Sequence, residues 1–127
     1  MAFLLAACDK ATTTPLPRPT TSPANLVSFN GTLQASGRNA HVFTVTQEGY
    51  VEATLVGLGA PASTKVGLGV GTPSVTGDCA TNYDVTTAAG PAAQIIGTGL
   101  PGTFCVAIYD VGNLTGPTIY TITVASS

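Results

Sequence analysis

Hydrophobic and polar residues alternate along much of the chain after residue 24, as they do in β-strands that bury one face. In residues 50–56, the apolar positions 51, 53 and 55 are separated by Glu52 and Thr54. The same spacing recurs nearer the C-terminus, and the side chains that it assigns to the core are Phe104, Val106, Ile108, Tyr120, Ile122 and Val124. The pattern therefore predicts antiparallel strands with one buried and one solvated face.

Turn-forming residues divide this part of the chain into short segments, which are residues 26–33, 40–46, 50–56, 65–71, 93–96, 102–110 and 118–124. The turn at residues 47–49 predicts an antiparallel hairpin between the second and third segments. Residues 72–90 are predicted to form a long loop. Short strands at this spacing indicate an all-β fold, an antiparallel β-sandwich or jelly roll of about seven to eight strands.

The first 24 residues differ from the rest. Residues 1–8 are apolar and end in Leu5-Ala6-Ala7-Cys8, which resembles the lipobox of bacterial lipoproteins. The resemblance implies cleavage before Cys8 and a lipid on its sulfur, which would hold the protein on a membrane. Residues 9–24 are rich in Thr, Ser and Pro and are predicted to be a disordered tether, so residues 25–127 are the predicted folded domain.

The apolar run lacks a positively charged n-region and is shorter than an ordinary signal peptide. Two interpretations therefore remain open: either the true start lies upstream of Met1, or the segment is not exported. No segment of the sequence approaches the roughly 20 apolar residues of a spanning helix. We expect the bacterial cell envelope as the location, with the lipid as the anchor.

Charged residues make up 8% of the sequence, and the formal net charge is −2. The basic side chains are isolated from one another, and they are Lys10, Arg18, Arg38 and Lys65. Nucleic-acid binding requires clustered basic residues that neutralise phosphates, so this class of function is excluded. Abundant Thr, Val and Gly with few charges also favour strands over surface helices.

Two cysteines remain once Cys8 is assigned to a lipid, namely Cys79 and Cys105. In an exported protein this pair is expected to form a disulfide bond. In a cytosolic protein the same two residues would be free thiols, so the expected bond depends on the interpretation of the N-terminus.

The segments FNGTL, HVFTVTQEGYVEATLVGL, KVGLGVGTP and GTFCVAIYDVGNLTGPTIYTITV together cover most of residues 25–127. Their series resembles the bacterial pre-peptidase C-terminal domain. That resemblance implies a compact β-sandwich of the kind appended to secreted proteases and other exported proteins. Its motifs are strand patterns, so it bears on the fold and carries no catalytic residues over to this chain.

The residues that could support chemistry are few. His41 is the only histidine and is in register with Phe43 and Val45, which predicts a partly buried strand residue instead of a catalytic base. The alternating glycines at residues 67–71 lack the Lys and Ser/Thr of a phosphate-binding loop. The aspartates do not have the spacing of a calcium loop. We therefore expect no enzymatic activity, no metal and no cofactor.

Two functional hypotheses follow. The first is a non-catalytic, membrane-anchored surface or periplasmic lipoprotein domain that serves in adhesion or protein interaction through loops and edge strands. The second is a carbohydrate- or polymer-binding accessory module for secreted hydrolases, with Tyr50, Tyr83 and Tyr109 as the ligand-binding rings. The expected partner is a protein in the first hypothesis and a polysaccharide in the second.

Overall fold

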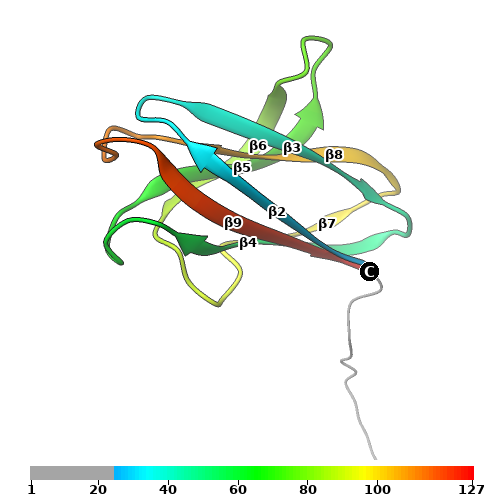
Figure 1. The fold of residues 1–127 in the computed structure, drawn as a ribbon. Coiled ribbons are helices and arrows are strands. Elements are labelled where there is room, and N and C mark those ends of the chain that lie inside the picture. The colour runs from blue at the N-terminus through cyan, green and yellow to red at the C-terminus, as the bar shows by residue number, and fades with distance from the viewer. Residues whose placement is uncertain (1–24) are drawn as a thin grey trace, which may run out of the picture.

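The computed structural model describes residues 25–127, which form two four-stranded antiparallel sheets packed face to face (Figure 1). The strand order is β2-β9-β4-β7 in one sheet and β3-β8-β5-β6 in the other. The strands are β2 (Asn25–Leu33), β3 (Arg38–Val45), β4 (Gly49–Leu58), β5 (Val66–Pro73), β6 (Cys79–Thr87), β7 (Ile95–Gly99), β8 (Gly102–Tyr109) and β9 (Thr118–Ser126). The prediction of an all-β sandwich is confirmed.

The core lies between the sheets and is built from alternate residues of the longer strands. On β9, Tyr120, Ile122 and Val124 are all buried, and on β8 Val106 and Ile108 are fully buried. The other large side chains that complete this core are Leu33, Phe43, Val45, Leu55, Val66, Leu68 and Ile95. Each such side chain contributes about 1.5–3 kcal/mol on burial, so this layer is the main source of stability.

The predicted hairpin between the second and third segments is wrong. β3 pairs with β8, whereas β4 pairs with β7 and β9, so residues 46–48 cross from one sheet to the other. Alternation of apolar and polar residues tells which face of a strand is buried. It does not tell which strand lies beside it. A hairpin within one sheet and a crossing between two sheets therefore give the same sequence pattern.

The predicted loop at residues 72–90 contains the strand β6, so that prediction is also wrong. β6 is an edge strand that pairs only with β5, and most of its side chains are exposed. Its register places Tyr83 and Val85 on the side of the core, opposite Val70 and Leu68. With so few apolar positions, the strand lacks the clear alternation that identifies its neighbours.

The chain enters and leaves the described domain at the same end of the sandwich (Figure 1). Asn25 of β2 pairs with Ser126 of β9, and its side-chain amide donates a hydrogen bond to the carbonyl of Ser127 at 3.4 Å. Cys8 and the predicted tether at residues 9–24 lie outside the described residues. Within residues 25–127, no helix is long and apolar enough to cross a membrane.

Candidate functional site

Three glycines of β5 face outward from the β3-β8-β5-β6 sheet, and neighbouring strands fill the space above them. The ring of Tyr109 on β8 lies over Gly67 and occupies the space that a side chain at residue 67 would fill. Thr81 and Asp84 on β6 approach Gly69 from the other side. The alternating glycines therefore allow side chains from β6 and β8 to meet across the strand between them.

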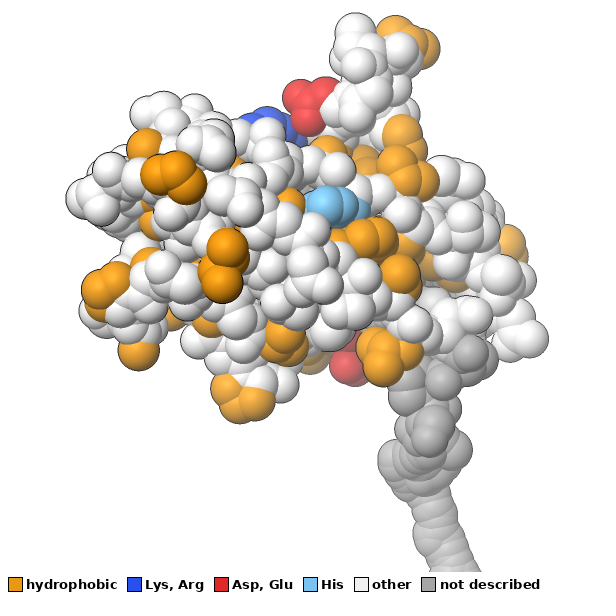
Figure 2. Space-filling view, in the orientation of Figure 1, with side chains coloured by type: hydrophobic (Ala, Val, Ile, Leu, Met, Phe, Trp, Pro, Cys, Tyr) orange, Lys and Arg blue, Asp and Glu red, His pale blue; other side chains and the backbone are white. Residues whose placement is uncertain are grey.

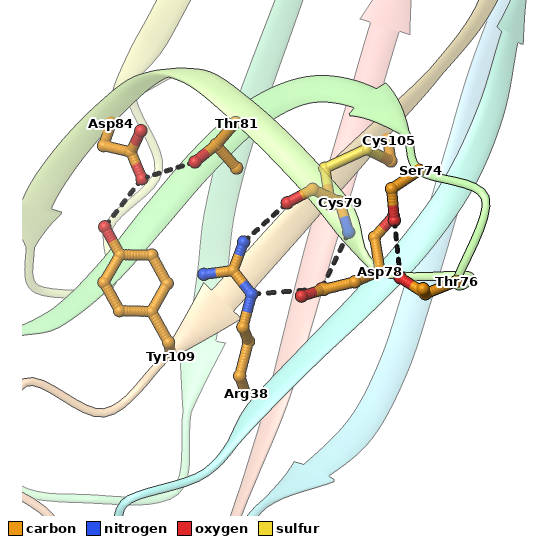
Figure 3. A network of polar contacts seen from close by, with 9 residues as sticks. All are labelled: Arg38, Ser74, Thr76, Asp78, Cys79, Thr81, Asp84, Cys105 and Tyr109. Atoms are coloured by element: carbon orange, nitrogen blue, oxygen red, sulfur yellow. Dashed lines mark hydrogen bonds and ion pairs between the residues drawn. A yellow bond between two sulfur atoms is a disulfide. The ribbon is translucent and has the colours of Figure 1, made fainter.

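Tyr109 and Asp84 make that connection (Figure 3). The Tyr109 hydroxyl donates a hydrogen bond to Asp84 Oδ2 at 2.7 Å, and Thr81 Oγ1 donates to the same oxygen at 3.1 Å. The hydrogen bond to the carboxylate holds the proton on Tyr109 and raises the pKa of its phenol above the usual value. A tyrosine held in its protonated form in this way is a poor general base.

Arg38 joins the same surface to the disulfide between Cys79 and Cys105 (Figure 3). Its Nε donates to Asp78 Oδ1 at 3.1 Å, and its Nη2 donates to the carbonyl of Cys79 at 2.7 Å. The Cys79 amide also donates to Asp78 Oδ1, and this bond, followed by that from Arg38, lowers the pKa of Asp78. The arrangement fixes the start of β6, and we interpret it as structural.

The two hydroxyls of this polar cluster, on Thr81 and Tyr109, share one carboxylate oxygen of Asp84. Its groups satisfy one another, and the guanidinium of Arg38 also lies 5.1 Å from the centre of the Tyr109 ring. Among residues 25–127, no three His, Cys, Asp or Glu side chains come close enough together to hold a metal ion.

A concave surface lies at the edge of the sandwich where β6 and β7 face each other. This edge groove has a volume of about 420 Å³, its inward-facing apolar side chains are Phe43, Val51, Val70, Ile95 and Phe104, and Ile96 lies at its rim. Tyr83 and Asn82 of β6 form one wall, and none of the lining residues is charged. The rings of Phe43 and Phe104 stack with their centres 6.0 Å apart at its base.

The edge groove is bordered by β7, a five-residue strand that pairs only with β4. β7 contains no charged residue and no proline, which are two of the devices by which edge strands avoid pairing with other chains. Ile96 on this strand is 65% exposed, and Tyr83 across the groove is 55% exposed. The groove thus combines unpaired backbone groups with exposed apolar side chains.

The opposite edge of the sandwich, between β2 and β3, is closed by aromatic side chains. Phe29 of β2 stacks on His41 of β3 with ring centres 4.8 Å apart, and Tyr120 of β9 contacts the same imidazole. His41 is half-buried on the inner side of β3, as its register predicted. Figure 2 shows a histidine side chain at the surface on the face of β2 and β9, where charged side chains are few.

The three tyrosines considered as ligand-binding rings lie on three different surfaces. Tyr83 lines the edge groove, and Tyr109 lies on the outer face of the β3-β8-β5-β6 sheet. Tyr50 alternates with the groove residue Val51 and so belongs to the outer face of the other sheet. The structure therefore does not bring them together into one platform.

The groove residues other than Tyr83 were not identified from the sequence. Phe43 and Phe104 were assigned to strand interiors, which is correct, but their position at an open edge depends on the strand order. The lack of charge in the segment Ile95–Gly99 was the one available signal for an unprotected edge. No protein-family model and no curated protein sequence matches the chain.

Proposed function

We propose that this chain is a non-catalytic, lipid-anchored domain of a bacterial envelope that binds an extended segment of another polypeptide along β7. The observation that carries the proposal is the edge groove, an uncharged apolar surface beside a strand with a free edge. An extended peptide can pair with such an edge through its backbone while alternate side chains enter the adjacent groove.

The chemistry of the groove limits what such a segment contains. Its lining offers phenylalanine, valine and isoleucine side chains and no charged group, so a charged side chain placed there would lose hydration without gaining a partner. We therefore infer an uncharged strand with β-branched or aromatic residues at alternate positions. The Asn82 side chain is the polar group that could orient the bound segment at the rim.

The position of the chain entry agrees with an anchored binding domain. Across the sheet, Asn25 of β2 pairs with Ser126 of β9, which pairs with Val51 of β4, and Val51 pairs with Gly97 of β7. Asn25 is therefore three strand spacings away from β7. Adjacent strands are about 4.8 Å apart, which separates the entry point from β7 by roughly 14 Å. The chain therefore enters the sandwich at the edge opposite β7.

A phage-displayed library of random peptides about 12 residues long tests the binding mode directly. Such a peptide spans roughly 40 Å when it is extended. We expect enrichment of uncharged peptides with alternating apolar residues. Ile96→Lys should abolish their binding, because it places a charge on the edge strand at the rim of the groove. Ile119→Lys is the matched control, since Ile119 is 68% exposed on the outer face of β9 and should be neutral.

Equal binding to both lysine variants, or no enrichment at all, would count against peptide binding along β7. A polysaccharide pull-down tests the second hypothesis from the sequence. If a polysaccharide binds and Tyr83→Ala abolishes that binding while Tyr50→Ala and Tyr109→Ala do not, the groove takes a sugar polymer instead of a peptide. The folded state of each variant is checked by its thermal unfolding midpoint.

A further inference from the structure

The seam between β2 and β3 contains the only histidine of the sequence, which takes part in a network of side-chain hydrogen bonds with Tyr120 and Asn39. The side-chain amide of Asn39 donates to the carbonyl of Thr32 at 2.9 Å and to Tyr120 Oη at 3.0 Å. Both amide hydrogens are thereby used. Tyr120 Oη is an acceptor towards Asn39, which leaves its own hydrogen free for a different partner.

That partner is His41, whose Nε2 lies 2.6 Å from Tyr120 Oη. With the hydroxyl as the donor, Nε2 is the unprotonated acceptor, which corresponds to the neutral imidazole with its proton on Nδ1. Phe29 covers the ring from β2 with an interplanar angle of 16°. The neutral form is thus matched by both a donor at Nε2 and an apolar face.

The surroundings of His41 offer nothing that would favour its charged form. The strands packed against it, β2, β8 and β9, contain no Asp, Glu, Lys or Arg, and Tyr120 is the one titratable side chain that they direct towards it. Arg38, the charged residue on β3 itself, projects to the outer face with Tyr109. Burial without a counter-charge lowers the pKa of His41 below its usual value.

We propose that Phe29, His41 and Tyr120 form an acid-sensitive latch that holds β2 against the rest of the sandwich. Protonation of His41 places a hydrogen on Nε2, so the nitrogen can no longer accept from the Tyr120 hydroxyl, and the new charge is half-buried with no carboxylate beside it. β2 is an edge strand whose sheet partner is β9 alone. Loosening it would lengthen the tether by the nine residues of β2 and expose the edge of β9.

The sign of the effect follows from the lowered pKa. The unfolded or opened chain takes up a proton near the ordinary value of 6.5, whereas the closed latch resists protonation to lower pH. The latch is therefore at full strength above that pH. It weakens as the pH falls through 6.5 towards the lower pKa of the closed state.

Hydrogen exchange of the whole folded chain, corrected for intrinsic rates, at about pH 7.5 and about pH 5 tests this proposal. We expect amides of β2 to exchange several-fold faster at the lower pH, relative to amides of β6 beside the disulfide. His41→Phe keeps a ring on Phe29 but cannot be protonated, so its β2 exchange should lose this pH dependence. An unchanged ratio in the wild type, or the same response in His41→Phe, would overturn the latch.

Titration of the single imidazole by NMR gives a second readout that does not depend on a variant. We expect a midpoint below 6.5, with the amide signals of Phe29 and Gly31 changing at the same midpoint. In Tyr120→Phe, which retains the ring, the donor to Nε2 is lost and the midpoint should move upward. A wild-type midpoint at or above the ordinary value, with no coupled change in β2, would refute the proposal even if His41→Phe did not fold.

Discussion

Tyr109 on β8 reaches across β5 to Asp84 on β6, and the two strands meet in this way because residue 67 between them is a glycine. The hydroxyl of Tyr109 lies 2.7 Å from Asp84 Oδ2, while its ring occupies the space above Gly67. The outer face of this sheet thus has its own small layer of packing, separate from the main core. Ala107 and the disulfide between Cys79 and Cys105 belong to the same layer and are buried.

Gly67→Val is expected to destabilise the domain by about 1–3 kcal/mol, because the new side chain would displace the Tyr109 ring. Gly97→Val is the matched control, since Gly97 is also a strand glycine but has open space where its Cβ would lie. Urea unfolding at neutral pH measures both. A cost for Gly67→Val no larger than that of Gly97→Val would contradict the packing described for Tyr109.

Removing the disulfide should cost about 3–4 kcal/mol, because the bond closes a loop between residues 26 positions apart in the sequence. The double variant Cys79→Ala with Cys105→Ala leaves two small apolar side chains in a buried site. Its unfolding midpoint should match that of the reduced wild type. Mass spectrometry after alkylation without reduction should find neither cysteine labelled, and two labelled thiols would show that the bond does not form.

Asp110 organises the loop between β8 and β9, and its contribution should depend on pH. One carboxylate oxygen accepts from the amide of Ser36, which is the largest cause of the lowered pKa, and the other accepts from the amides of Gly112, Asn113 and Leu114. The stabilisation is therefore present above the ordinary pKa of 3.8 and is lost as the pH falls below it.

Asp110→Asn offers one acceptor oxygen where the carboxylate offers two, so this variant should have a lower thermal midpoint at pH 7 than the wild type. The difference should shrink as the pH falls below 3.8, because the wild-type carboxylate becomes protonated in that range. Differential scanning fluorimetry at a series of pH values measures it. A difference that stays constant across the series would mean that the carboxylate charge plays no part in ordering this loop.

The fold class could be predicted because the long strands bury one face, and their alternation reports that directly. β9 is the clearest case, with buried residues at alternate positions over its full length. Strand partners could not be predicted, because pairing is decided by contacts between segments far apart in sequence. The groove at β7 depends on the same information, since an edge exists only once the strand order is known.

β6 was missed for a different physical reason. Only two of its side chains, Tyr83 and Val85, lie on the side of the core, and Cys79 belongs to the small buried layer around the disulfide. A strand with so little apolar area carries almost no periodic signal. The disulfide partner Cys79 was identified from the sequence, yet its place at the start of a strand was not.

The proposed lipid on Cys8 is the feature on which the proposed function depends most, because it would decide where the domain encounters a partner. Metabolic labelling with an alkyne-tagged fatty acid, in bacterial cells that express the chain from its own gene, measures it directly. We predict a labelled protein in the membrane fraction, and complete loss of label and membrane association in Cys8→Ser with Cys79 and Cys105 left intact. Label that persists in Cys8→Ser, or an unlabelled wild type, would contradict the lipid anchor.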